Sequence, residues 1–274
     1  AISLVVADPD WGLLYIFAIA GIAMYGTLIA GWSSNNNWSL LGSLRASAQM
    51  ISYEVTMGLS LVGIFMVFQT LKLTDMAIAQ DTTLRVFGFV EVLFGLSLPG
   101  WLDWLRLPAW GIVYQPLGFI LFLTCIMAEN KRPPFDLPEG ESEIIAGYHL
   151  EYSGMRFGLF FMSEFIQIIV IAGLVATLFF GGWSIPYLSQ QTIIGALTPF
   201  FGEGLATVAC MALHFGAFMV KVVAMIWLQM QLRWTLPRFR YDQVMDLCWK
   251  IMLPLSIANI LVTGLVMLIA GGGQ

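Results

Sequence analysis

The sequence predicts an all-α integral membrane protein that forms a single polytopic domain over residues 1–274. The chain is 59% hydrophobic and only 11% charged, whereas a soluble domain carries about 25% charged residues. Its mean hydropathy is +0.83, and long apolar runs recur along it, many near the ~20 residues that cross a bilayer. These features exclude a soluble enzyme, and no basic tract indicates nucleic-acid binding.

Six apolar segments are expected to cross the membrane. They cover residues 11–31, 40–70, 108–128, 157–182, 204–232 and 251–270. The second would be about 46 Å long at ~1.5 Å per residue, so it must tilt, kink or project beyond the ~30 Å hydrocarbon core. We expect the run 86–101, which holds Glu91 and ends in Pro99 and Gly100, to form an interfacial or re-entrant helix. Residues 183–202 are expected to form a loop.

Lysine and arginine set the predicted orientation of these spans, because short cytoplasmic loops carry an excess of both. Two loops are involved, an acidic loop over residues 129–156 and a basic loop over residues 233–250. Their basic residues are Lys131, Arg132, Arg156, Arg233, Arg238, Arg240 and Lys250. Two spans separate the loops, so we expect both on the cytoplasmic face and both ends of the chain on the other.

The stretch 129–164 is unusually acidic for a segment between apolar helices. It holds seven of the 17 acidic residues, namely Glu129, Asp136, Glu139, Glu141, Glu143, Glu151 and Glu164. Solvation would be enough to explain an isolated surface loop, and Glu164 could be a solvated helix end. Together with Glu54, however, these residues predict a line of carboxylates from the loop into the bilayer, as a proton or quinone pathway would need.

Glu54 and Arg45 lie within the second predicted span. They are nine residues apart, about 180° around a helix, so they cannot pair with each other. Glu54 could be a structural carboxylate that a neighbouring helix satisfies. It could also exchange protons, since burial and nearby cations shift a carboxyl group in opposite directions. Arg45 could anchor at the interface or hold a loop carboxylate.

Lys221 lies deep in the fifth predicted span. It is about 16 Å from Leu232 at the end of that span, too deep for easy snorkelling, so we expect a buried acidic partner. His214 lies seven residues earlier on about the same helix face. It is either a hydrogen-bonded structural residue or part of a relay.

The three cysteines, Cys125, Cys210 and Cys248, are far apart and lie in apolar segments. Metal and iron–sulfur sites need clustered cysteine or histidine. We therefore expect no metal, cluster or disulfide framework in this chain.

Three long stretches resemble a known family. They are GWSSNNNWSLLGSLRASAQMISYEV at 31–55, AENKRPPFDLPEGESEIIAGYHLEYSGMRFGLFFMSEF at 128–165 and LPRFRYDQVMDLCWKIMLPL at 236–255. Together they resemble the H subunit of bacterial respiratory complex I, whose mitochondrial counterpart is NADH dehydrogenase subunit 1. The resemblance implies a membrane subunit of proton-pumping NADH:quinone oxidoreductase in the bacterial inner membrane. Such a subunit forms part of the quinone chamber, couples quinone reduction to proton translocation, and does no catalysis alone.

The resemblance also implies roles for particular residues. Those beside the quinone chamber would be Arg132, Phe135, Asp136, Glu139, Glu141 and Glu143. Those on the proton path would be Glu54, Glu129, Glu151, Glu164, Lys221, Arg45 and Tyr53. The substrate would be ubiquinone or menaquinone, and FMN and iron–sulfur clusters would lie in partner subunits. Implied partners are the peripheral-arm quinone-site and terminal-cluster subunits, small membrane subunits that lead to the antiporter-like arm, and membrane lipid.

The sequence departs from the family pattern in two ways. The family normally has eight spans, and its first two spans, a charged loop and an amphipathic helix are absent here, so we expect the chain to be part of a longer protein. The stretch 84–107 also looks longer than in relatives. One alternative is the related subunit of a ferredoxin- or hydrogen-linked membrane-bound hydrogenase. A secondary transporter would predict inverted repeats, which the sequence lacks, and a passive anchor would not need Glu54 or Lys221.

Overall fold

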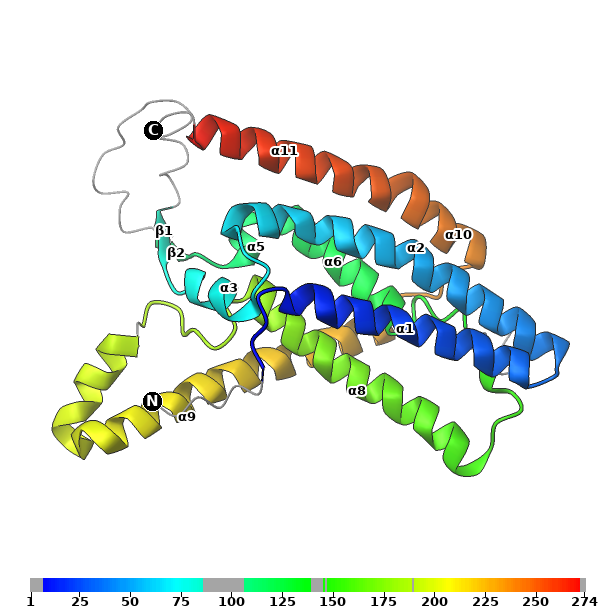
Figure 1. Ribbon diagram of the computed structural model, residues 1–274, viewed down its shortest axis with the longest axis horizontal. Coiled ribbons are helices and arrows are strands. Elements are labelled where there is room, and N and C mark those ends of the chain that lie inside the picture. Colours follow the sequence, from blue (N-terminus) through cyan, green and yellow to red (C-terminus); the bar gives the residue numbers. More distant parts are fainter. Residues whose placement is uncertain (1–6, 86–105, 139–144, 146, 189, 272–274) are drawn as a thin grey trace.

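The computed structural model describes residues 7–85, 106–138, 145, 147–188 and 190–271. Five helices in this part of the chain are long and apolar enough to cross a membrane. They span Gly12–Ser33, Asn37–Phe68, Gly154–Phe179, Gly204–Thr235 and Tyr241–Ile269. Long helices make up most of the molecule (Figure 1), so the predicted all-α, multi-pass membrane fold is confirmed. The expected interfacial helix at 86–101 lies outside the described residues.

The first two helices, α1 (Gly12–Ser33) and α2 (Asn37–Phe68), form a hairpin with a tight turn. Asn36 caps α2, because its side chain accepts a hydrogen bond from the backbone N–H of Trp38 at 3.0 Å. At ~1.5 Å per residue, α2 is about 48 Å long, close to the length predicted for the second span. It packs against α1, α6 (Pro116–Glu129) and α11 (Leu253–Gly271). The small buried residue Gly42 lets the start of α2 approach the backbone of residues 147–148 closely. A Cβ at Gly42 would lie 2.9 Å from the Gly147 backbone.

The third predicted span, 108–128, is interrupted. It forms the short helix α5 (Gly111–Tyr114), a break at Gln115, and α6 (Pro116–Glu129). Gln115 has φ −133° and ψ 64°, because the ring of Pro116 disfavours helical geometry in the residue before it. The break is buried, and the Gln115 side chain bonds to Asn259 and Thr263 of α11 at 2.9 and 2.6 Å. The predicted span 108–128 is therefore built from two helical pieces that meet at a buried break.

Two further boundaries differ from the predicted ones. The helix α9 (Gln190–Thr235) contains Pro199 and kinks at Gly202, so residues 190–201 are helical where a loop was expected (Figure 1). The helix α8 (Gly154–Phe179) lies close to its predicted position. The basic loop is also shorter than expected, because α10 (Tyr241–Asp246), the π-helix η3 (Leu247–Met252) and α11 (Leu253–Gly271) follow one another directly.

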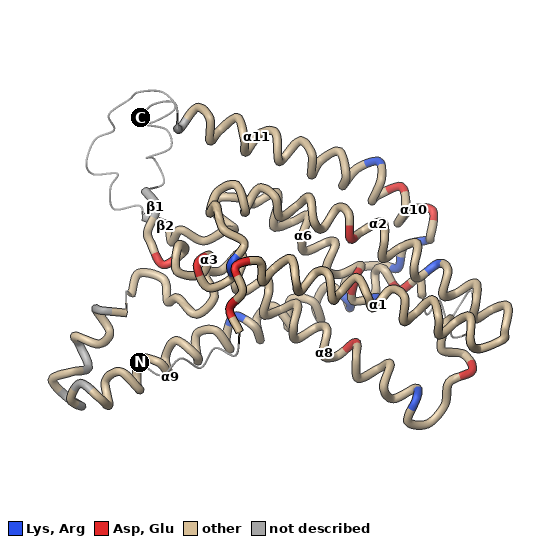
Figure 2. Tube along the Cα trace, viewed as in Figure 1, with Lys and Arg blue, Asp and Glu red and all other residues tan. Residues whose placement is uncertain are grey.

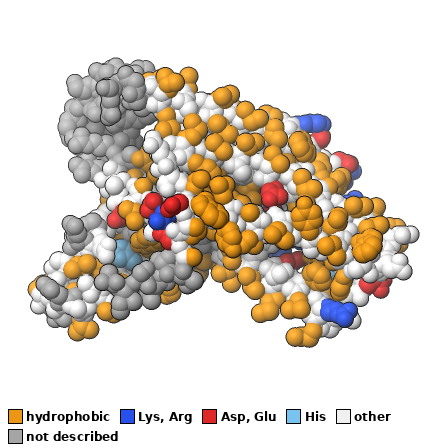
Figure 3. Space-filling view, in the orientation of Figure 1, with side chains coloured by type: hydrophobic (Ala, Val, Ile, Leu, Met, Phe, Trp, Pro, Cys, Tyr) orange, Lys and Arg blue, Asp and Glu red, His pale blue; other side chains and the backbone are white. Residues whose placement is uncertain are grey.

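The acidic and basic loops meet at one end of the helix bundle. The backbone N–H of Phe239, before α10, donates to the carbonyl of Pro134 at 3.1 Å. The 3-10 turn η2 (Gly147–His149) contacts the start of α2, where Ser39 Oγ donates to the Tyr148 carbonyl at 2.9 Å. Figure 2 shows charged residues gathered there, with long uncharged stretches along α1, α9 and α11. Hydrophobic side chains cover most of the visible flank (Figure 3).

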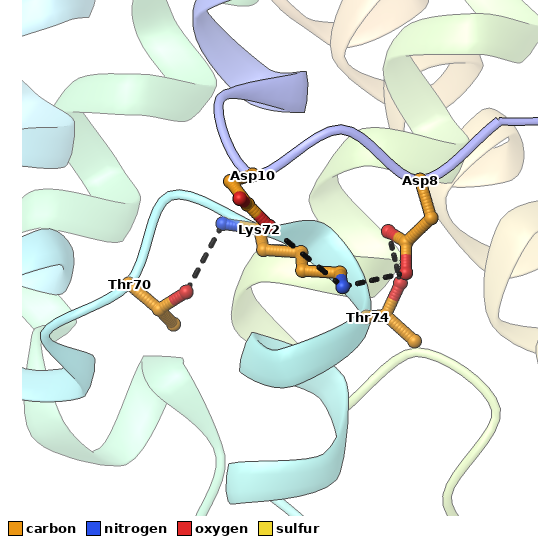
Figure 4. Close-up of polar contacts among 5 residues, drawn as sticks. All are labelled: Asp8, Asp10, Thr70, Lys72 and Thr74. Carbon is orange, nitrogen blue, oxygen red and sulfur yellow. Dashed lines mark hydrogen bonds and ion pairs between the residues drawn. The ribbon is translucent and has the colours of Figure 1, made fainter.

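The opposite end contains α3 (Leu73–Ala79) and a two-stranded ladder. Strands β1 (Thr83–Arg85) and β2 (Arg106–Pro108) are antiparallel and flank residues 86–105. Nearby, Lys72 Nζ lies 3.1 Å from Asp8 Oδ2, and Thr74 donates to the same carboxylate at 2.6 Å (Figure 4). These contacts tie the chain before α1 to the start of α3.

Candidate functional site

A buried ion pair joins the acidic loop to α8. Arg132 Nη2 lies 3.0 Å from Glu164 Oε2, and their side chains are only 11% and 6% exposed. The guanidinium carbon also lies 6.0 and 5.2 Å from the ring centroids of Phe161 and Phe165. Residues three or four apart share a helix face, so one face of α8 supplies both the carboxylate and the rings. The guanidinium therefore has a fixed position, in surroundings with little water.

Glu129 lies beside this ion pair, at the end of α6. It is 7% exposed, and its Oε1 accepts a hydrogen bond from Gln167 Nε2 at 3.3 Å. Gln167 is three residues after Glu164, so both carboxylates approach the same face of α8. Within the described residues, no lysine or arginine lies within ion-pair distance of Glu129. The charge of Lys131 also acts on this carboxylate. A buried carboxylate that bonds to a neutral amide is suited to taking up a proton.

The two carboxylates border a cavity of about 540 Å³ between α1 and α8. Apolar residues of α1, α2, α6 and α8 form most of its wall. Its polar lining includes Glu129, Lys131, Ser163, Glu164 and Gln167, and these residues lie toward the acidic loop. An apolar chamber with a few polar groups at one end is suited to an amphiphilic ligand.

The loop that closes this end of the cavity is held by packing and by charge. The Lys131 ammonium lies 5.0 Å from the ring centroid of Tyr148, within cation–π range. Tyr148 packs edge-on against His149 at 4.6 Å and Phe160 at 5.6 Å. Burial, and then the charge of Lys131, lower the pKa of His149. His149 is therefore favoured in its neutral form, which limits the positive charge beside Lys131.

Glu54 and Tyr53 lie next to each other on α2 but face different neighbours. Glu54 is half-buried and points at α1, where a Cβ on Gly21 would come 2.7 Å from its Oε1. Glycine at position 21 therefore makes room for the carboxylate. The Tyr53 hydroxyl donates to the carbonyl of Val244 at 3.1 Å, and its ring lies 5.5 Å from that of Phe135. Tyr53 thus joins α2 to the acidic loop and to α10.

The remaining candidates comprise Glu151, Asp136 and Arg45, together with three carboxylates that lie outside the described residues. Glu151 is exposed and accepts a hydrogen bond from Asn36 Nδ2 at 2.8 Å, at the α1–α2 turn. Asp136 is half-buried. The guanidinium of Arg45 lies 5.5 Å from the ring centroid of Tyr241. The carboxylates Glu139, Glu141 and Glu143 lie outside the described residues.

Comparison with known proteins places the chain in a family. The model of a family described as NADH dehydrogenase matches residues 1–264. The chain is 44% identical over 266 residues to the H subunit of NADH-quinone oxidoreductase from Bdellovibrio bacteriovorus, covering 96% of this chain and 66% of the relative. It is also 44% identical over 267 residues to the H subunit of the same enzyme from Thermomicrobium roseum, covering 97% and 67%.

The chain belongs to the NADH dehydrogenase family. The match extends across all three stretches on which the resemblance was drawn. The chain spans about two thirds of the length of the family members it matches, 66% for the relative from Bdellovibrio bacteriovorus.

Lys221, a residue carried over from the family pattern, lies far from the buried ion pair. Its ammonium donates to the carbonyls of Phe180, Gly182 and Ser184 at 2.7, 2.9 and 2.6 Å. Phe180 is sixteen residues beyond Glu164, about 24 Å along α8. The expected acidic partner is therefore wrong, because backbone carbonyls take its place and, in the described part of the chain, no carboxylate lies within ion-pair distance. His214 also meets a carbonyl, that of Trp183, at 2.9 Å.

Several neutral amide side chains at the site were not predicted from the sequence, because the sequence argument rested on charged residues. Besides Gln167, the side chain of Asn130 donates to Gln229 Oε1 of α9 at 2.9 Å. Gln49 Nε2 donates to the carbonyls of Ala128 and Phe135 at 3.0 and 2.9 Å. These amides fix both ends of the 129–135 turn. The spacing of Gln167 three residues after Glu164 is the one signal that could have found any of them.

Metal-ligating residues do not cluster in the described part of the chain, where no group of three or more His, Cys, Asp or Glu is placed to hold an ion. The three cysteines are free and buried. The side chains gathered here can hold charge, exchange protons and border an apolar chamber.

Proposed function

We propose that the chain is the membrane subunit of a proton-translocating NADH:quinone oxidoreductase that contributes to the quinone chamber and couples quinone reduction to proton movement. One observation carries this proposal: Glu129 and Glu164, the second paired with buried Arg132, line the polar end of an apolar cavity. The names of its relatives, H subunits of NADH-quinone oxidoreductase, support the same conclusion.

The residues of this chain would act through charge. A quinone has a polar head and an apolar tail, so the tail suits the apolar walls and the head suits the end near Arg132. Negative charge on the reduced head would compete with Glu164 for the guanidinium. A unit charge at 4 Å is worth about 4 kcal/mol at an effective dielectric of about 20. Such a change is large enough to free Glu164 to take up a proton.

Protons would then move among the neighbouring carboxylates. Gln167 joins Glu129 to the face of α8 that carries Glu164, and Glu54 lies on α2 across from α1. Arg45, Tyr53 and Glu151 would also belong to this path. Beside the quinone chamber would lie Phe135, Asp136, Glu139, Glu141 and Glu143. Lys221 lies too far from the cluster to exchange a proton with it directly.

Partner subunits would supply the electrons and connect the chain to the rest of the complex. Electrons would come from FMN and iron–sulfur clusters in partner subunits, which would dock on the end where the acidic and basic loops meet. That end would face the cytoplasm, with the chain in the bacterial inner membrane, because the basic residues of both loops lie there. Small membrane subunits would connect the helices to the antiporter-like arm.

The proposal is tested by removing one charge of the pair in the assembled complex. Glu164→Gln in sealed membrane vesicles should lower both NADH:quinone reductase activity and proton pumping. The matched control is Asp10→Asn, a side chain that is 93% exposed near α3, away from the acidic loop, and should change neither. Normal reductase activity with normal pumping in Glu164→Gln would contradict the proposal.

A further inference from the structure

The C-terminal end of α8 is buried, yet almost all its carbonyls have hydrogen-bond donors. An α-helix leaves its last four carbonyls without intrahelical partners, and burying such groups unpaired is costly. After Phe179 the chain turns through Gly181 and Gly182, which have φ +73° and +54°. The carbonyl of Ala176 accepts from the backbone N–H groups of Phe180 and Gly182 at 3.2 and 2.9 Å. Donors for the carbonyls that follow must come from other parts of the chain.

Gln80, at the end of α3, supplies the first donors. Its amide nitrogen donates to the carbonyls of Thr177 and Leu178 at 3.1 and 3.2 Å. Its amide oxygen accepts from the backbone N–H groups of Gly111 and Gly181 at 3.0 and 2.9 Å. Gln80 is 1% exposed, so it joins α3, α5 and the end of α8 in the protein interior.

Lys221 and His214, both on α9, supply donors for the carbonyls of residues 180–184, which directly follow α8. Lys221 donates to Phe180, Gly182 and Ser184, and the indole of Trp110 lies 5.1 Å from its ammonium. His214 Nδ1 lies 2.9 Å from the carbonyl of Trp183. Because a carbonyl can only accept, this nitrogen must carry a proton.

The carbonyls of Phe180, Gly182 and Ser184 form a cage around the Lys221 ammonium and satisfy all its N–H donors. An ammonium has three N–H donors, and each meets one carbonyl. A neutral amine has only two, so loss of the proton would leave a buried carbonyl unpaired. The negative end of the helix dipole also favours a cation at this point. Burial disfavours the charge of the ammonium, and Asp81, on the turn after α3, attracts that charge electrostatically. Among the described residues, His214 is another titratable group that faces this segment.

We propose that Lys221 is a fixed cation that caps α8 and sets its register against α9, and that it does not carry protons. It is thus a positioning residue. Gln229, which bonds Asn130 beside Glu129, is eight residues further along α9, about 12 Å away. Glu164 and Gln167 lie on α8. Fixing the two helices at the cage therefore fixes both sides of the buried acidic cluster, a consequence that rests on the proposed function, whereas the cap itself does not.

Three variants of the full complex test the cap. Lys221→Arg keeps a charge that stays protonated at working pH, and should retain assembly, quinone reduction and proton pumping. Lys221→Met keeps the length of the stem without charge, and should lower the yield and heat stability of the complex. Lys221→Ala should do the same, with recovery when ethylammonium or propylammonium is added. Tetramethylammonium, which has a charge but no N–H donor, should not restore it.

The outcomes separate the possible roles. An assembled Lys221→Arg complex with normal quinone reduction but no pumping would identify a proton carrier and overturn the proposal. Normal stability of Lys221→Met, or recovery of Lys221→Ala that follows amine basicity rather than size and N–H donors, would also overturn it. If the stability results hold while Glu164→Gln pumps normally, the cap stands and the proposed function fails.

Discussion

Arg132 shows how much depends on one pair of side chains. Its guanidinium is enclosed by Glu164, Phe161 and Phe165. The carboxylate of Glu164 therefore balances its positive charge at close range. A buried ion pair adds little net stability, because desolvation offsets the attraction. Removing one partner, however, typically costs about 3–5 kcal/mol. Retention of such a pair beside a cavity points to a use other than stability.

A double-mutant cycle tests this balance. Glu164→Leu leaves the Arg132 charge buried beside aromatic rings and should destabilise the protein by about 3–5 kcal/mol. The double variant Arg132→Met with Glu164→Leu should recover most of that loss, since no uncompensated charge remains. The measurement is thermal unfolding of the purified complex in detergent. Strictly additive losses in the double variant would show that the two side chains do not balance each other.

The long apolar elements followed from the sequence, and their interruptions did not. Length and hydropathy placed α1, α2 and α8 to within a few residues. Pro199 indicated a loop, but the helix continues past it to the kink at Gly202. Pro116 carried a usable signal for the break at Gln115, because proline restrains the residue before it. Its polar partners on α11 depend on tertiary packing.

The partners of Lys221 likewise could not be predicted from the sequence. Depth along a helix indicated that the ammonium needs a partner, which is correct. It could not indicate that the carbonyls beyond α8, a segment about forty residues earlier in the chain, would supply it. The chemical requirement was readable from one sequence, whereas the identity of the partner depends on how distant elements pack.

The polar network at the break between α5 and α6 is expected to stabilise the packing of α11. Gln115→Leu should leave the buried amide of Asn259 and the hydroxyl of Thr263 without their partner, at a cost of about 1–3 kcal/mol. Thr124→Ala, which removes only a bond to its own helix, should have a much smaller effect. Thermal unfolding of both variants makes the comparison. Equal stability of the two would mean that the network does not hold α11 against the break.

In the whole molecule, two polar regions lie at opposite ends of an apolar bundle (Figure 2). One end gathers the acidic loop, the start of α10 and the α1–α2 turn around the buried carboxylates. The other gathers α3, the β1–β2 ladder and the capped end of α8. The helices α8 and α9 extend between them. Under the proposed function, the acidic end would change its protonation while the other end remains fixed.

The most direct test is the number of protons pumped per NADH oxidised by the complex carrying Glu129→Gln, in sealed vesicles. Glu129 is buried with one amide partner, so the amide variant keeps the shape and removes the proton site. The account predicts a clear fall in this ratio, while Asp10→Asn, at the opposite end, leaves it unchanged. An unchanged ratio at a normal rate of quinone reduction would contradict the account.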